Sequence, residues 1–111
     1  MKIDETIGFL SRNKRDFLLE KIELLTKKIE TLQYIILFGS YARGEETATS
    51  DIDILVITEK PTERFLRGEL CSELEEEQVD LIFYTLNQFR SSDCLFVRQV
   101  KKEGVVLWKK N

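Results

Sequence analysis

Three aspartates stand out because each lies in or beside an otherwise apolar run. Asp51 and Asp53 flank Ile52 at the start of one run, and Asp80 lies inside another. Residues i and i+2 of a strand point to the same face, so the first two carboxylates are expected side by side. Two such charges about 7 Å apart repel by roughly 2 kcal/mol at an effective dielectric constant of 20. A divalent cation such as Mg²⁺ would relieve this repulsion, although an isolated Asp-x-Asp is more often a pair of solvated residues.

Asp80 occupies the predicted strand Val79 to Tyr84 as its single acid. Burying a lone carboxylate costs several kcal/mol unless the group is paired or bound to a metal. One interpretation is a salt bridge to a lysine or arginine. The other is that Asp80 lies beside the strand of Asp51 and Asp53 and completes a cluster of three carboxylates.

Gly39-Ser40 follows directly after the apolar run Tyr34 to Phe38. Glycine lets a ligand approach the backbone closely, and a helix N-terminus offers free N–H groups to phosphate. The Ser40 hydroxyl can donate one further hydrogen bond. Taken alone, the dipeptide fits an ordinary turn equally well.

The sequence pattern of the N-terminal half predicts the helices and strands that position these residues. Residues 11–33 predict one amphipathic helix, capped by Ser11 or Asn13, that either covers a sheet or binds a partner. Its apolar stripe is spaced at three and four residues: Leu18, Ile22, Leu25, Ile29 and Leu32. A buried strand is expected at 34–38, a helical turn and loop at 40–50, and a second strand at 51–57.

The C-terminal half continues the alternation of helices and strands. A helix is expected at 62–77, with its apolar side chains facing inward: Phe65, Leu66, Leu70 and Leu74. A strand at 78–85 follows, then a helix at 93–103 that Asp93 caps and that Gly104 ends in left-handed geometry. A last strand is expected at 105–108. The pattern predicts a single α/β (α+β) domain over residues 1–111, with a small mixed sheet of three to five strands flanked by helices.

Composition narrows the functional classes. The chain has 111 residues, 17 Lys and Arg against 20 Asp and Glu, and no histidine. The net charge of −3 disfavours a generic nucleic-acid binder, and the lack of histidine removes the commonest general base and zinc ligand. Cys71 and Cys94 are expected as reduced, partly buried thiols. No segment reaches the about 18 apolar residues of a membrane span, and the charged start does not predict a signal peptide, so we expect a cytoplasmic protein.

The chemical motifs together resemble a known superfamily. Gly39-Ser40, then Asp51-Ile52-Asp53, then Asp80 resemble the nucleotidyltransferases of the DNA polymerase beta type. The stretches Gly39 to Gly44 and Ser50 to Val56 are similar to the minimal nucleotidyltransferase branch of prokaryotes, as is the closing Glu103-Gly104 with its strand. The resemblance covers about residues 34 to 108.

The resemblance implies a role for each motif residue. Gly39 and Ser40 would hold the triphosphate of ATP or another nucleoside triphosphate, with Arg43 near phosphate. Asp51 and Asp53 would bind two Mg²⁺ ions. Asp80 would ligate one of them and assist deprotonation of the attacking hydroxyl. The implied reaction transfers a nucleoside monophosphate, AMP in the first instance, to a hydroxyl group.

The resemblance also implies a partner. Minimal nucleotidyltransferases act as antitoxins of small helical HEPN toxins, in some cases by transferring AMP to a toxin tyrosine. Two alternatives stay open: an antitoxin that neutralises by binding alone, and a small-molecule transferase of the aminoglycoside-modifying kind. The helix at 11–33 is a candidate contact surface, and whether the chain forms homo-oligomers or hetero-oligomers is left open.

Overall fold

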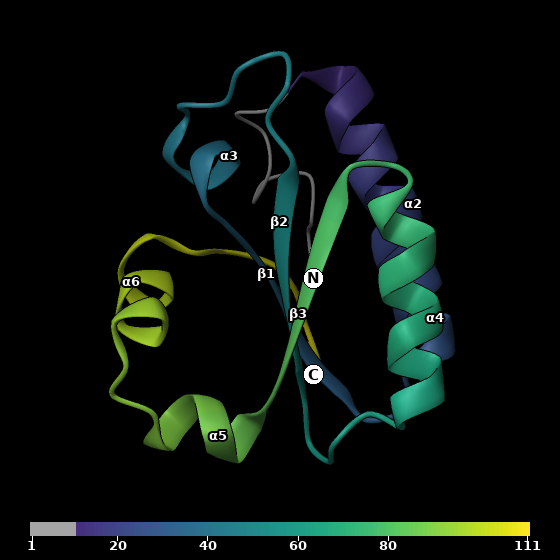
Figure 1. Ribbon diagram of the computed structural model, residues 1–111, viewed down its shortest axis with the longest axis vertical. Helices are drawn as coiled ribbons and strands as arrows, with labels where there is room; N and C mark the ends of the chain where they lie inside the picture. The colour runs from purple at the N-terminus through teal and green to yellow at the C-terminus, as the bar shows by residue number, and fades with distance from the viewer. Residues whose placement is uncertain (1–10) are drawn as a thin grey trace.

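The computed structural model describes residues 11–111, which form one mixed sheet between two layers of helices (Figure 1). The helices are α2 (Arg12–Lys28), α3 (Ser40–Arg43), α4 (Arg64–Glu75), α5 (Leu86–Ser91) and α6 (Leu95–Glu103). The strands are β1 (Leu32–Phe38), β2 (Ile52–Thr58), β3 (Val79–Thr85) and β4 (Val105–Lys109).

The sheet has four strands in the order β3-β2-β1-β4. β1 runs antiparallel to β2 and β4, whereas β2 and β3 are parallel. The end of β1 and the beginnings of β2 and β3 therefore meet at one end of the sheet, where α3 lies in Figure 1. The predicted mixed sheet of three to five strands between helices is confirmed.

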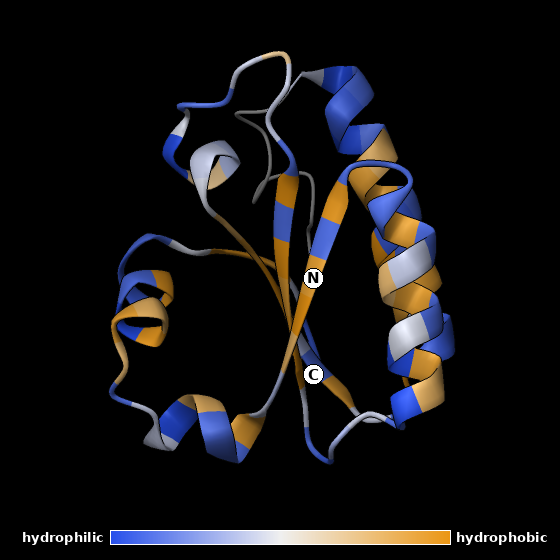
Figure 2. Cartoon of the chain, viewed as in Figure 1, coloured by the Kyte–Doolittle hydropathy of each residue, from blue (hydrophilic) through white to orange (hydrophobic). Residues whose placement is uncertain are grey.

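Both faces of the sheet are buried, and apolar colour dominates the strands in Figure 2. α2 and α4 cover one face, where Leu18 and Leu25 pack with Leu70 and Leu74. α5 and α6 cover the other, and Val100 packs there against the sheet. Burial on both faces explains why the central strands are nearly continuous apolar runs. Asp53 is the one charged residue within β2.

The N-terminal helix is shorter than its apolar pattern predicts. Ser11, rather than Asn13, caps α2, because its side chain accepts a hydrogen bond from the Lys14 N–H at 3.3 Å. The helix ends at Lys28, and Leu32 already belongs to β1. Leu32 is buried like the residues of the stripe, so periodicity extends past the end of the helix. The stripe covers the sheet, which is the first of the two roles considered for this helix.

α4 begins where Glu63 caps it, with the carboxylate accepting from the N–H groups of Phe65 and Leu66 at 2.9 Å. Leu70 and Leu74 are buried as predicted. The prediction that Phe65 faces inward is wrong, since its side chain is 75% exposed. Phe65 lies on the helix face of Glu69 and Ser72, away from the sheet.

A separate short helix precedes the last predicted helix. α5 was not predicted, although its capping box is in the sequence: the Thr85 side chain accepts from the Gln88 N–H, and the Gln88 side chain accepts from the Thr85 N–H. α6 then starts at Leu95 with Cys94 as its N-cap. The expectation that Asp93 caps this helix is therefore wrong.

Gly104 ends α6 in extended geometry, with φ −65° and ψ 145°, so the predicted left-handed conformation is wrong. Glycine is required there for space. A Cβ at this position would lie 2.6 Å from the Val100 carbonyl oxygen and 2.7 Å from Cγ2 of Ile36. This close contact fixes the end of α6 against β1.

Two further expectations concern the thiols and the membrane. Cys71 and Cys94 are both free, but only Cys71 is partly buried, and Cys94 is exposed. Within residues 11–111, no helix combines the length and the apolar character that a membrane span needs.

Candidate functional site

Two of the three acids face each other across neighbouring strands. The register of the parallel pair β2 and β3 places Asp53 opposite Asp80. Opposed residues in adjacent strands share a face, and the strands lie about 4.8 Å apart. The structure therefore brings Asp80 beside the Asp-x-Asp motif, as the second interpretation of that residue required.

Asp51 and Asp80 are more accessible than Asp53. Asp51 precedes β2 by one residue and is exposed, whereas Asp53 is half-buried. Asp80 is exposed as well, so the expectation of a buried carboxylate is wrong. β3 is an edge strand and Asp80 is its second residue, which leaves that carboxylate open to solvent. The cluster thus combines one partly desolvated acid with two that water reaches.

The electrostatic environment of Asp53 is unfavourable to its charge. Burial raises the pKa of the Asp53 carboxyl, and the charges of Asp80 and Asp51 raise it further, while Arg43 acts in the opposite direction. Within residues 11–111, no salt bridge joins any of the three acids to a lysine or arginine. The salt bridge considered for Asp80 is thus absent from the described part of the chain.

The acids do not form a closed ligand set as they stand. Across residues 11–111, no three side chains of His, Cys, Asp or Glu have an arrangement that could hold a metal ion. Asp51 and Asp80 are exposed, so their side chains have rotamers available that the half-buried Asp53 lacks. Binding a cation would require these two carboxylates to turn toward Asp53.

The cluster of acids also restricts which residue can occupy position 39. Its backbone has φ 77° and ψ −154°, a region that is essentially restricted to glycine. A Cβ there would overlap Oδ2 of Asp53 and lie 3.1 Å from its Cγ. Gly39 therefore does more than allow a turn, because it leaves the space that the Asp53 carboxylate occupies.

Ser40 opens the four-residue helix α3, with Gly39 as N-cap. The first N–H groups of a helix have no partner inside it, so they remain available to a ligand. Tyr41, the next residue, is buried in the core and anchors α3 to the sheet. Gly39 and Ser40 are thus held at the end of the sheet where the acids lie.

Arg43, the last residue of α3, is held by two glutamates. Its Nε donates to Oε1 of Glu45 at 2.7 Å, and its guanidinium lies 3.4 Å from Oε2 of Glu103. The hydrogen bond to Glu45 is the main cause of the raised pKa of Arg43. Glu103 lies at the end of α6. From the sequence it was noted only as part of the closing Glu103-Gly104, with no role in the site.

A hollow of about 210 Å³ lies between α3 and α6, beside Gly39. The residues that α6 contributes to this hollow were not predicted from the sequence, although their spacing places them on one face of a helix. The residues that line it are Phe38, Gly39, Arg43, Phe96, Gln99, Val100 and Glu103.

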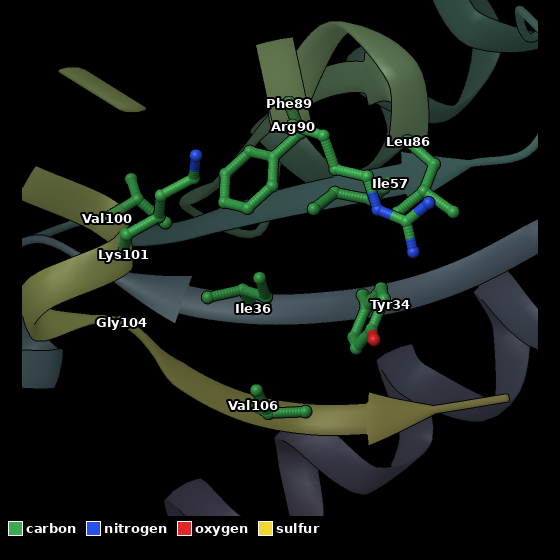
Figure 3. A pocket seen from close by; sticks show the side chains of 10 residues that line it. All are labelled: Tyr34, Ile36, Ile57, Leu86, Phe89, Arg90, Val100, Lys101, Gly104 and Val106. Carbon is green, nitrogen blue, oxygen red and sulfur yellow. The ribbon is translucent and has the colours of Figure 1, made fainter. Parts of the chain in front are cut away.

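A second cavity, of about 320 Å³, lies between the sheet and helices α5 and α6 (Figure 3). Its walls are mostly apolar, and its charged side chains are Arg90 and Lys101. Neither the three acids nor Gly39 and Ser40 line it. The candidate site is therefore the open end of the sheet, together with the hollow beside α3.

Comparisons with known proteins identify the family of the chain. The family model described as polymerase beta, nucleotidyltransferase, matches residues 20–111. The protein adenylyltransferase MntA of Shewanella oneidensis is 37% identical over 90 residues, which is 78% of this chain and 61% of the relative. The chain thus spans about three fifths of the length of that relative.

Solved structures give the same fold. A toxin–antitoxin crystal structure with AMP-PNP contains a chain that is 34% identical, with a TM-score of 0.67 over 84% of this chain and 73% of the other. A chain in the complex of a tri-AMPylated Shewanella oneidensis HEPN toxin with its MNT antitoxin is 32% identical, with a TM-score of 0.58 over 83% of this chain and 69% of the other.

Proposed function

This chain belongs to the polymerase beta nucleotidyltransferase family, and we propose that it transfers AMP from ATP to a hydroxyl group of a partner protein in a Mg²⁺-dependent reaction. The observation that carries the proposal is the pairing of Asp53 with Asp80 across β2 and β3, next to Gly39. Because one sheet carries all of these residues, we also propose that the chain acts as a single minimal nucleotidyltransferase domain.

The donor set fits Mg²⁺. Carboxylate oxygens are the ligands that this cation prefers, and it usually keeps several waters and binds substrate phosphates. Asp51, Asp53 and Asp80 would hold the two ions that the family resemblance implies. The mutual repulsion that raises the pKa of Asp53 is what a divalent cation would remove. When bound, the metal supplies charge stabilisation for the attacking and leaving oxygens.

Gly39, Ser40 and Arg43 are proposed to hold the triphosphate. The backbone N–H groups at the start of α3 and the Ser40 hydroxyl can donate to phosphate oxygens. The Arg43 guanidinium is planar and suits bidentate binding of phosphate. Arg43 would have to exchange at least one glutamate contact for a phosphate contact when the nucleotide binds.

The proposed reaction is an in-line displacement at the α-phosphorus of ATP. The acceptor oxygen forms a bond to that phosphorus, the bond to the bridging oxygen breaks, and pyrophosphate leaves with the electron pair. In this proposal Asp80, whose carboxylate is open to solvent beside Asp53, takes the hydroxyl proton. No histidine is needed for these steps, in agreement with a sequence that has none.

The proposed acceptor is a tyrosine of a HEPN-type toxin, which makes the chain an antitoxin. Support comes from the relatives, since one is named a protein adenylyltransferase and another was solved with a tri-AMPylated HEPN toxin. The apolar stripe of α2 packs in the chain's own core, so the contact with the partner must use other surfaces.

Incubation with a HEPN-type toxin, such as the Shewanella oneidensis toxin of the solved complex, together with Mg²⁺ and ATP tests the proposal. Label in the α-phosphate of ATP should appear on the HEPN protein, whereas label in the γ-phosphate should leave with pyrophosphate. Asp53→Asn should lower labelling roughly a thousandfold, and Asp93→Asn, which changes an exposed acid outside the site, should leave it unchanged. Transfer by Asp53→Asn at the wild-type rate contradicts the assignment. Neutralisation of the toxin by the Asp51→Ala, Asp53→Ala double variant would instead support an antitoxin that acts by binding alone.

A further inference from the structure

The two ends of the hollow between α3 and α6 differ in the side chains that line them. At one end, the Arg43 guanidinium is paired with Glu103. Gln99 precedes Glu103 by four residues, which is about 6 Å along a helix, and Phe96 lies almost one turn further. A molecule that binds phosphate at Gly39 and Arg43 would therefore extend along α6 toward Gln99 and Phe96.

The far end of the hollow is aromatic and fixed in place. The rings of Phe38 and Phe96 meet edge to face with their centroids 5.2 Å apart, and the Tyr84 ring is tilted by 36° against that of Phe96 at 5.9 Å. These neighbours hold Phe96 in position. Flat heterocycles stack on such aromatic side chains with little preference for one base over another.

Among residues 11–111, Gln99 is the polar side chain of the hollow for which the structure gives no charged partner. Three polar side chains line the hollow, and two of them, Arg43 and Glu103, are bound to each other. Gln99 is exposed, so its side chain is free to turn toward a ligand. A carboxamide offers one acceptor and one donor group side by side. That pattern matches the N6 amino group and N7 of adenine, whereas guanine presents two acceptors at the same edge.

The volume of the hollow limits how much of a nucleotide it can hold. Complete small-molecule pockets have volumes of about 300–1,000 Å³. At about 210 Å³, the hollow suits one part of a nucleotide rather than the whole molecule. The triphosphate would then lie outside it, toward Asp53 and Ser40.

We propose that this hollow is the nucleobase subsite and that Gln99 is the residue that selects adenine. The proposal rests on the nucleotidyl transfer proposed above, and it adds the determinant of base preference. Phe96 provides the stacking surface, and the pair of Arg43 and Glu103 marks the phosphate end.

Equilibrium binding of α,β-methylene analogues of ATP and GTP, measured by calorimetry with Mg²⁺, tests the proposal. The wild-type chain should prefer the ATP analogue. Gln99→Leu should weaken its binding by roughly five- to hundredfold, the usual range for one bidentate base contact, and should bring the two affinities close together. Gln99→Arg should shift the preference toward the GTP analogue, because arginine pairs with O6 and N7 of guanine. Asn87→Leu, which removes an exposed amide from α5, should change neither affinity.

Three outcomes would overturn the inference while leaving the proposed function in place. They are equal affinity of the wild type for both analogues, an unchanged ratio of affinities in Gln99→Leu, and an effect of Gln99→Leu on the KM for the acceptor alone. Failure of the proposed function looks different: the wild type would then transfer no AMP from ATP to any partner. Gln99 is exposed, so its variants should keep the wild-type Tm, which confirms that they fold.

Discussion

The two ends of the paired strands β2 and β3 differ in how their polar residues are satisfied. At the C-terminal ends, Thr58 lies opposite Thr85, and both are buried. Thr58 donates to the Lys60 carbonyl oxygen at 2.6 Å, and Thr85 caps α5. At the N-terminal ends, Asp53 lies opposite Asp80, and burial, with the charges of Asp80 and Asp51 added to it, raises the pKa of Asp53.

The difference supports the proposal that the ligand binds at the aspartate end. Proteins generally satisfy buried polar groups, and departures from this rule occur at functional sites. The threonine end follows the rule with hydrogen bonds inside the chain. At the aspartate end, the half-buried Asp53 has no salt bridge within residues 11–111, and glycine in a conformation that other residues avoid lies beside it. We therefore expect substitutions at the two ends to separate function from stability.

The largest effect should come from the carboxylate of Asp53. Asp53→Asn should lower AMP transfer roughly a thousandfold, since a bound cation contributes several kcal/mol to stabilising the transition state. Thr58→Val, at the other end of the same strand, should keep transfer and lose about 1 kcal/mol of stability, because the Lys60 carbonyl loses the shorter of its two hydrogen bonds and keeps the one from Thr31 at 3.4 Å. Turnover assays and urea unfolding of both variants measure this separation. Equal losses of activity would remove the distinction between the ends.

Gly39→Ala should cost both folding and function. The positive φ accounts for about 1–3 kcal/mol, and the overlap of the new methyl group with Asp53 adds to it. Gly68→Ala is the matched control, since this glycine lies inside α4 with no atom near its added Cβ. That control should stabilise the chain by about 0.5–1 kcal/mol. A neutral Gly39→Ala in thermal unfolding would show that the close contact is relaxed in solution.

The pH dependence of the free energy of unfolding should report how unfavourable the environment is to the Asp53 charge. Burial contributes most to this, and the charges of Asp80 and Asp51 add to it. A carboxyl with a raised folded-state pKa favours folding in its protonated form, so its contribution is lost as pH rises from the unfolded value, near 3.9, through the folded value. Without Mg²⁺, Asp53→Asn should remove this fall and be more stable than the wild type at pH 7. Urea unfolding of the wild type and of Asp53→Asn from pH 4 to 7 measures this difference in stability. A variant that is less stable than the wild type across the range would contradict the account.

The smallest effect should lie on the α2 face, away from both strand ends. Lys21 is almost buried and lies 2.6 Å from Oε1 of Glu77, which is itself well exposed. Glu77→Gln should lower stability by about 1 kcal/mol and leave AMP transfer unchanged. A change in the KM for ATP would indicate that this face communicates with the site.

The sequence allowed prediction of the buried strands and the glycine–acid motif, because apolar runs and local chemistry are written in neighbouring residues. It could offer the pairing of Asp53 with Asp80 only as one of two interpretations, since strand register is a tertiary property. The hollow was missed for the same reason: Arg43 and Glu103 are 60 residues apart in the chain. Periodicity also misplaced the end of α2, because buried loop and strand residues continue the apolar stripe of a helix.

Binding of Mn²⁺, a paramagnetic substitute for Mg²⁺, tests the central claim most directly. Electron paramagnetic resonance of the chain with the α,β-methylene analogue of ATP should show bound Mn²⁺ in the wild type and in Asp93→Asn. Asp53→Asn and Asp80→Asn should each weaken binding by tenfold or more, because each removes a proposed ligand. Wild-type affinity for Mn²⁺ in both of these variants would contradict the claim that the aspartate end of β2 and β3 is a cation site.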